Sequence, residues 1–240
     1  MERNQVLSTL RSLSTSHIQQ ANWFLYKFKA TGLTDKVSVA VRIKSPLDIQ
    51  SVKDTLQILI ERHSILRSIY YEQDGKIVQE IRENVDINFE QISASSWSDE
   101  ELEGQLCDAV KRPFNLESSG VFRACLFTAL FIRVDHKVSH LLCNLQSSFR
   151  LPPLHLPPNF LTVVYPFKNC CKRSVTENIL LLTVHQIAGD WESLLILVNE
   201  FVALYESKIN HESLDLPILN KSYEDYIQKE LDLLNSSGGF

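Results

Sequence analysis

The sequence NILLLTVHQIAGDWESLLILVNEFVALYESK, residues 178–208, contains the pattern that decides the fold. Its first eight residues are a short, mostly apolar run, which is typical of a buried strand. After the loop, apolar residues recur at the spacing of one helix face: Leu194, Val198, Phe201 and Tyr205. Asp190 or Ser193 is expected to cap this helix. The segment therefore predicts a strand, a short loop and a helix in succession.

Residues 36–43, KVSVAVRI, predict another strand, because apolar and polar residues alternate strictly there. A helix is expected over about 48–62, where apolar residues return at helical spacing and Asp48 stands at the start as a cap. Asp74-Gly75 separates two β-prone runs and predicts a tight hairpin, since this pair accepts the positive φ angles of the turn.

A further helix is predicted after Ser98, which forms a capping box with Glu101. Its apolar stripe consists of Leu102, Leu106, Ala109 and Val110. This helix is expected to end before Pro113, and a strand is expected over residues 121–127. A last helix is expected at about 223–234, capped by Ser222 and followed by a frayed tail at 236–240. These elements predict an α/β or α+β protein with a mixed sheet flanked by helices.

The composition indicates a soluble, cytoplasmic protein. The net charge of −5 argues against nucleic acid as the main partner, because such sites need dense Lys and Arg. The five cysteines are odd in number and the N-terminus lacks the apolar core of a signal peptide, so a reduced setting is expected. No run of 18 apolar residues predicts a membrane-spanning helix.

Residues 129–173 differ in composition from the rest of the chain. Six Lys and Arg stand against one acid, five of the eight prolines lie here, and glycine is absent. We expect an insertion without stable structure, or a stretch never selected to fold. It also contains histidines and cysteines that could ligate a metal: His136, His140, Cys143, His155, Cys170 and Cys171. Their spacing matches no complete ligand set, so no metal site is predicted.

Several separated motifs together resemble the N-terminal half of the condensation domains of nonribosomal peptide synthetases. SHIQQANWFL (16–25) resembles the opening motif, with Ser16, Gln19, Trp23 and Leu25 at its fixed positions. The other matching stretches, in chain order, are ERHSILRSIY (61–70), KRPFNLESSGVFRACLF (111–127), HQIAGDWES (185–193) and SYEDYIQ (222–228). The resemblance implies that 1–235 is an N-terminal lobe, interrupted by the insertion at about 129–173.

The resemblance implies a fold like that of chloramphenicol acetyltransferase, with two α/β lobes around a tunnel. This chain supplies one lobe, and a C-terminal lobe is expected from elsewhere. The implied reaction joins a carrier-bound acyl or peptidyl donor to a carrier-bound aminoacyl acceptor through an amide bond. The expected partners are carrier domains, whose phosphopantetheine arms hold the substrates, so no intrinsic cofactor is expected.

The family's His-His-x-x-x-Asp-Gly loop places Gln186 at the position of the catalytic second histidine. Glutamine can form hydrogen bonds, but it has no accessible pKa and cannot act as a general base. His185 corresponds to the first histidine. A shifted alignment that makes His185 catalytic breaks the spacing to Asp190 and puts the side chain on the opposite face of the strand end. Trp191 replaces the motif's glycine.

Asp190 matches the motif's aspartate, which pairs with a buried arginine in the family, and Arg67 is the candidate partner. The alternative is that Asp190 caps the following helix and Arg67 lies at the surface, and both roles of Asp190 are compatible. Trp23 is expected to pack in the core.

Three functions follow from these patterns. In the first, the chain is one lobe of a condensation-type enzyme, and this lobe is inactive alone. The second is a non-catalytic or degenerate module, or gene fragment, that docks carrier domains. In the third, the chain is another acetyltransferase-like acyltransferase, in which a histidine deprotonates the acceptor. Glutamine at position 186 argues against activity in this third case as much as in the first.

Overall fold

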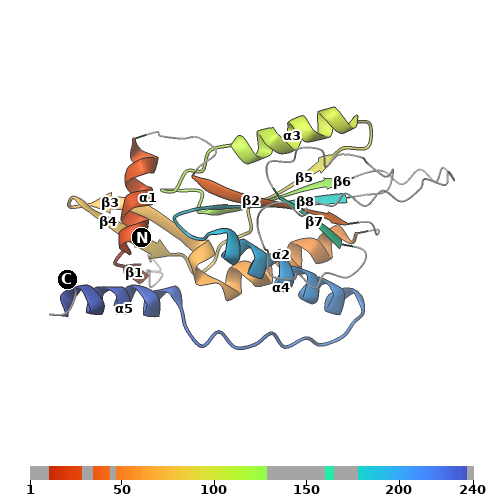
Figure 1. Ribbon diagram of the computed structural model, residues 1–240. Helices are drawn as coiled ribbons and strands as arrows, with labels where there is room; N and C mark the ends of the chain where they lie inside the picture. Colours follow the sequence, from red (N-terminus) through yellow and green to blue (C-terminus); the bar gives the residue numbers. More distant parts are fainter. Residues whose placement is uncertain (1–10, 29–34, 44–46, 129–159, 165–177, 237–240) are drawn as a thin grey trace, which may run out of the picture.

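The computed structural model describes residues 11–28, 35–43, 47–128, 160–164 and 178–236 (Figure 1). Within these ranges the chain forms two sheets, five α-helices and one short 3₁₀ helix. In chain order the elements are β1 (Arg11–Leu13), α1 (His17–Lys27), β2 (Lys36–Ile43), α2 (Ile49–Arg62), the short 3₁₀ helix η1 (Ser64–Arg67), β3 (Ser68–Gln73), β4 (Lys76–Ile81), β5 (Phe89–Ser93), α3 (Asp99–Lys111), β6 (Phe122–Thr128), β7 (Phe160–Val164), β8 (Asn178–His185), α4 (Trp191–Ile209) and α5 (Tyr223–Asn235).

The larger sheet has the strand order β5-β6-β8-β2-β7, and the smaller sheet has the order β1-β4-β3. In the larger sheet β5 runs parallel to β6, and each other neighbouring pair is antiparallel. The sheet is therefore mixed, and the predicted fold class is confirmed.

The strand β8 lies in the middle of the larger sheet and is buried at all eight positions. Its even-numbered apolar residues pack with α2 and α4, and Ile179 and Leu181 pack with α3 on the other face. Figure 1 shows α3 on one side of the sheet and α2 and α4 on the other. Helices cover both faces, which explains why β8 reads as a continuous apolar run rather than an alternating one.

The predicted strand β2 is confirmed, but both of its faces are buried, whereas its alternating sequence indicated one buried face. Val39, Val41 and Ile43 join the core beneath α2 and α4, whereas Ala40 joins the core beneath α3. The predicted hairpin is also confirmed: β3 and β4 pair antiparallel, and both turn residues adopt positive φ, 52° at Asp74 and 71° at Gly75.

The predicted helix caps are present at α2, α3, α4 and α5, formed by Asp48, Ser98, Asp190 and Ser222. The helix α1 was not predicted, although Ser16 and Gln19 form a capping box of the Ser-x-x-Gln type. That box is the local signal that could have found the helix. Trp23 of α1 is 3% exposed, so its expected place in the core is confirmed.

The expectation of an unstructured insertion differs from the structure at five residues. Phe160–Val164 form β7, which pairs antiparallel with β2 at the edge of the larger sheet. The rest of the predicted insertion, with its histidines and cysteines, lies outside the described residues, as do the last four residues of the tail.

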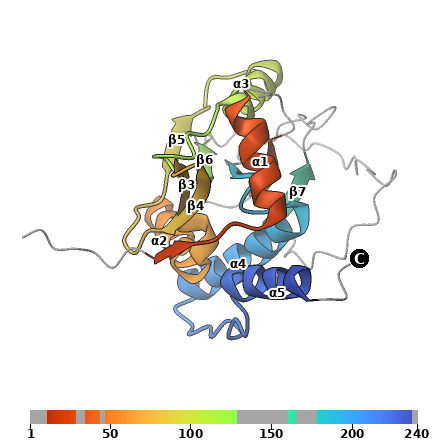
Figure 2. The same ribbon diagram turned by 90° about the vertical axis from the view of Figure 1, so that its left-hand side faces the viewer.

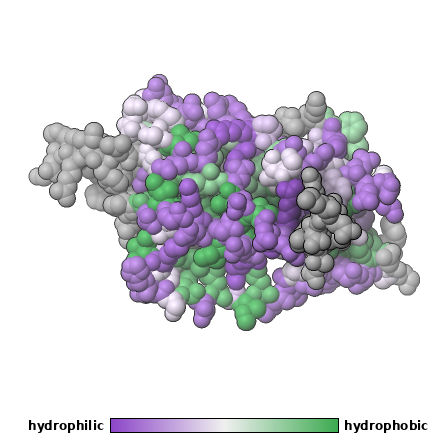
Figure 3. Space-filling view, turned by 180° about the vertical axis from the view of Figure 1, so that it is seen from behind, coloured by the Kyte–Doolittle hydropathy of each residue, from purple (hydrophilic) through white to green (hydrophobic). Residues whose placement is uncertain are grey.

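The helix α5 lies beside α1 at the same end of the molecule (Figure 2). The Tyr223 hydroxyl lies 3.2 Å from Ser16 Oγ, and the backbone N–H of His17 donates to Glu230 Oε2 at 3.2 Å. The face opposite to that of Figure 1 mixes hydrophobic and hydrophilic side chains (Figure 3). Among the described helices, none has the length and apolar character needed to cross a membrane.

Candidate active-site loop

The loop between β8 and α4 contains the residues that the sequence singled out. The strand β8 ends at His185, and α4 begins at Trp191, so four loop residues precede the cap Asp190. The Gln186 N–H donates to the Asp35 carbonyl at 2.9 Å, and the Ala188 N–H donates to the His185 carbonyl at 2.9 Å. These backbone hydrogen bonds fix the loop against the start of β2 and against its own strand.

His185 points into the protein and is 1% exposed. Its ring lies between Tyr26 and Phe114, with centroid distances of 6.2 Å and 5.9 Å, and meets both edge-on. The Nδ1 atom accepts a hydrogen bond from the Ile187 N–H at 3.1 Å, which places the proton of the neutral ring on Nε2. His185 is therefore held inside the fold and away from the surface.

The charge state of His185 follows from this burial. Desolvation lowers its pKa to about 4, while Asp35 opposes that shift and Lys36 adds to it. Within the described part of the chain, its Nε2 atom has no hydrogen-bond partner. The imidazole is therefore neutral at physiological pH and has no access to an external substrate.

Gln186, in contrast to the buried His185, is exposed at the surface. Its carbonyl accepts a hydrogen bond from Asn22 Nδ2 of α1 at 3.2 Å. The next carbonyl, of Ile187, accepts from Gln19 Nε2 at 3.4 Å. The backbone at position 186 is therefore held by α1 on one side and by Asp35 on the other. Sequence reasoning missed Asn22 and Asp35, because neither has a local signal.

Asp190 caps α4. Its carboxylate accepts from the Ser193 N–H at 2.9 Å and from Ser193 Oγ at 2.6 Å. These hydrogen bonds lower the pKa of Asp190 below its usual value. Trp191, at the position of the motif's glycine, starts the helix and packs partly buried against the core. A side chain at this position is therefore compatible with the turn.

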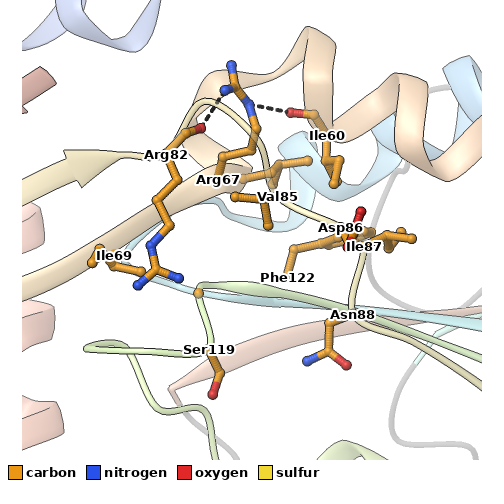
Figure 4. Close-up of a pocket in the computed structure, with 12 residues that line it drawn as sticks. Ile60, Arg67, Ile69, Arg82, Val85, Asp86, Ile87, Asn88, Ser119 and Phe122 are labelled. Carbon is orange, nitrogen blue, oxygen red and sulfur yellow. Dashed lines mark hydrogen bonds between the residues drawn. The ribbon is translucent and has the colours of Figure 1, made fainter. Parts of the chain in front are cut away.

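The predicted pair of Arg67 with Asp190 is not formed. Arg67 instead donates to backbone carbonyls, from Nε to Ile60 at 3.0 Å and from Nη1 to Arg82 at 2.5 Å (Figure 4). Its Nη1 also donates to the Glu83 carbonyl at 3.1 Å. These carbonyls belong to the end of α2 and to the segment after β4. The half-buried Arg67 therefore joins α2 to the smaller sheet, and Asp190 acts as a cap.

A small pocket lies around Arg67 rather than around the loop (Figure 4). It has a volume of about 40 Å³, enough for a few water molecules at most. Its walls include Ile60, Leu66, Arg67, Arg82, Asn88 and Ser119, and none of the residues 185–190. This pocket is too small to be a substrate site and is separate from the candidate loop.

A buried polar network supports the contact between α1 and the loop. Gln19 is fully buried, and its Nε2 donates to Tyr70 Oη at 2.9 Å and to Gln79 Oε1 at 3.2 Å. Gln79 donates in turn to Ser68 Oγ at 2.8 Å. Burial raises the pKa of Tyr70, so its hydroxyl stays protonated. The network joins α1 to β3 and β4 and fixes Gln19.

No described group of three or more His, Cys, Asp or Glu side chains is arranged to hold a metal ion. The candidate histidines and cysteines of 129–173 lie outside the described residues.

Comparison with known sequences shows which proteins this chain is similar to. The sequence model described as Condensation domain matches residues 10–137. The chain is 27% identical over 221 residues to the dimodular nonribosomal peptide synthase of Bacillus subtilis (strain 168), and this match covers 92% of the chain and 7% of that protein. The chain therefore spans only a small part of this curated relative.

Comparison with solved structures shows the same fold in longer chains. The X-domain in its complex with OxyB from teicoplanin biosynthesis matches with a TM-score of 0.67 and 20% identity, over 94% of this chain and 39% of that one. The starter condensation domain of the rhizomide synthetase RzmA matches with a TM-score of 0.67 and 11% identity, over 95% of this chain and 45% of that one.

Proposed function

Because the chain belongs to the condensation domain family, we propose that it serves as the N-terminal half of a condensation domain in nonribosomal peptide synthesis. In the reaction, the amine of a carrier-bound acceptor attacks the thioester of a carrier-bound donor, giving an amide and releasing the donor's thiol. Both substrates are attached to phosphopantetheine arms of carrier domains. The proposed function therefore requires no organic cofactor on this chain.

The main observation in support of the proposal is the environment of Gln186. Gln186 is exposed at the end of β8, next to a buried and neutral His185. The Gln186 amide can donate to a carbonyl or accept from an amine, but it cannot remove the proton of the attacking nitrogen. We therefore expect binding of the reacting groups without the base contribution of about 10²–10⁴-fold, and no measurable activity of the chain alone.

A further lobe is needed to close the site. The chain spans 39% and 45% of the two solved chains described above. Gln186 faces the outside of the described part of the chain rather than an enclosed cavity. Residues beyond this sequence, in the same polypeptide or in another, would therefore supply the opposite wall and exclude water from the reacting groups.

The outer face of α1 is a suitable contact for a carrier domain. Ile18, Phe24, Leu25 and Phe28 are each more than half exposed, at 61%, 59%, 52% and 69%. The rings of Phe24 and Phe28 lie 4.3 Å apart. Exposed apolar side chains gathered on one helix favour binding of a partner. The same helix holds the Gln186 carbonyl through Asn22, so a carrier docked here lies beside the loop.

A second candidate function is a non-catalytic module that binds carrier domains, and Gln186 is the residue that favours it. The two functions differ in what a histidine at this position does. In a condensation site with intact geometry, Gln186→His restores proton transfer. In a module that only docks carriers, the substitution has no effect on product formation.

The test combines the purified chain with a C-terminal lobe and with loaded donor and acceptor carriers, and it detects the dipeptide by mass spectrometry. We expect no product above the assay background from the unmodified chain, and a product signal at least about tenfold above that background from Gln186→His. Gln20→His is the matched control, because it places a histidine on the exposed side of α1.

Two outcomes would contradict the proposal. Strong product formation that persists in Gln186→Ala would show that this residue is not at the reacting site. A Gln186→His variant that binds loaded carriers as well as the unmodified chain, yet forms no product, would favour the docking module.

A further inference from the structure

Two consecutive carbonyls of the loop accept hydrogen bonds from two side-chain amides of one helix. Asn22 Nδ2 donates to the Gln186 carbonyl at 3.2 Å, and Gln19 Nε2 donates to the Ile187 carbonyl at 3.4 Å. Gln19 and Asn22 are three positions apart on α1, which places both amides on one side of the helix. We call this pair of contacts the amide clamp.

The clamp acts on a residue whose backbone is also held from the other side. The Gln186 N–H donates to the Asp35 carbonyl at 2.9 Å, just before β2. Both backbone polar groups of Gln186 are therefore paired, while its side chain is exposed. A side chain at this position starts from a fixed Cα and points outward, which is the arrangement that favours contact with a ligand.

The two arms of the clamp differ in rigidity. Gln19 is fully buried, and its Oε1 accepts from the Ser16 N–H at 2.9 Å. Its Nε2 has two N–H groups and three acceptors, Tyr70 Oη at 2.9 Å, Gln79 Oε1 at 3.2 Å and the Ile187 carbonyl at 3.4 Å, so the Ile187 carbonyl shares a donor with another acceptor. Moving Gln19 would leave several buried polar groups without partners, so this arm is fixed by the core. Asn22 is half-buried and makes its contact to the Gln186 carbonyl near the surface. Asn22 is therefore the arm that can be altered without disturbing the core.

We propose that Asn22 and Gln19 are positioning residues, which set the direction of the side chain at position 186 by clamping the carbonyls of residues 186 and 187. Position 186 as the reacting position rests on the proposed function. The clamp itself is a property of the fold, so it can be tested without any condensation assay.

The variant Asn22→Asp tests the clamp. It keeps the shape of the side chain but replaces the N–H donor by a carboxylate oxygen, which faces the Gln186 carbonyl. Gln20→Glu is the matched control, because it makes the same amide-to-acid change on the same helix. Gln20 donates to the Thr15 carbonyl at 3.2 Å and does not contact the loop in the described structure. Gln19 is not used, since a buried carboxylate there would endanger folding.

The first measurement is amide hydrogen exchange of the full-length chain by NMR. In Asn22→Asp we expect the Gln186 and Ala188 amides to exchange about fivefold faster, the factor that one neutral hydrogen bond corresponds to. Amides of Leu181 and Leu182 in β8 should keep their rates, and Gln20→Glu should change neither group.

The second measurement reports on the side chain itself. In the Gln186→His background, the introduced imidazole should give one set of ring resonances when Asn22 is present. In Gln186→His with Asn22→Asp, we expect doubled or broadened ring resonances, because the residue samples more than one direction. Gln186→His with Gln20→Glu should retain a single set.

The inference is overturned if Asn22→Asp leaves loop exchange unchanged, or if it accelerates exchange equally in the loop and in β8. The latter result would mean that Asn22 contributes only to overall stability. A loop response in both measurements combined with no dipeptide from Gln186→His would uphold the clamp and contradict the proposed catalytic function. The two proposals can therefore fail independently.

Discussion

At the scale of single residues, two neighbours in the sequence have opposite environments. His185 ends a strand that is buried on both faces, and its ring lies between two aromatic rings inside the core. Gln186 is the first residue beyond that strand and is exposed. Alternation along β8 does not explain this difference, because both faces of the strand are buried. Gln186 is exposed because it lies in the loop beyond the end of the strand.

The buried His185 predicts a specific loss of stability in mild acid. Its pKa is lowered from 6.5 in the unfolded chain to about 4 in the fold. Between these values the unfolded chain binds the proton and the folded chain does not. The free energy of unfolding therefore falls as the pH decreases from about 6.5 toward 4, by roughly 2–3 kcal/mol from this residue. Urea denaturation at pH 7 and pH 4.5 measures the change.

The comparison that isolates this effect uses His185→Phe, which fills the same aromatic site without a titrating group. We expect this variant to lose less stability between pH 7 and pH 4.5 than the unmodified chain does. His211→Phe is the control, because His211 lies at an exposed turn. Equal losses in all three proteins would contradict the assignment of the effect to His185.

At the scale of elements, α1 connects the candidate site to an exposed surface. Its inner side contributes Trp23 to the core and the amide clamp to the loop. Its ends are held by other elements: Ser16 and His17 contact α5, and Lys27 pairs with Glu117 after α3. The outer side carries the exposed apolar residues. A partner that binds this outer side is therefore joined to the loop by one rigid helix.

The exposed rings of α1 predict how carrier binding responds to substitution. Phe24→Asp with Phe28→Asp places two charges in the proposed contact and should weaken the binding of a loaded carrier by about tenfold or more. Isothermal titration calorimetry measures the affinity. The matched control is Ile196→Asp on α4, whose side chain is also about half exposed, at 52%. Equal affinity of all three proteins would exclude α1 as the carrier contact.

At the scale of the whole molecule, the larger sheet lies between two helical layers, and α5 lies apart from them (Figure 1). The segment 210–222 connects α4 to α5 without a helix or strand and is almost entirely exposed. The helix α5 contributes Ile227 to the buried set, together with polar contacts to α1. The stability of α5 therefore depends on few buried side chains.

Hydrogen exchange measured by mass spectrometry should reflect this difference between helices. We expect peptides from α5 to exchange at least about tenfold faster than peptides from α4, which buries seven side chains against the sheet and α2. Peptides from β8 should be the slowest, because this strand is covered on both faces. Protection of α5 equal to that of α4 would show that α5 is an integral part of the core.

The sequence by itself determined most of the regular elements and their boundaries. The bounds of β2 and β8 agree with the predicted 36–43 and 178–185, and α2 agrees with about 48–62. Caps such as Ser98 with Glu101 connect residues three positions apart, so they can be recognised without knowing the fold. These are all local properties, which depend on neighbouring residues only. Position 186 as the reacting position stays a prediction, taken from the family motif around it.

Only the tertiary structure decided which distant groups meet. Arg67 bonds to carbonyls at the end of α2 and after β4, and Asp190 bonds to Ser193, although both residues had suited an ion pair with each other. Asn22 and Asp35 hold the Gln186 backbone, yet they lie more than 150 positions from it in the sequence. The physical reason is that the partner of a long polar side chain depends on how the sheets and helices pack in space. Spacing along the chain fixes a cap or a strand face, but it carries no information about that packing.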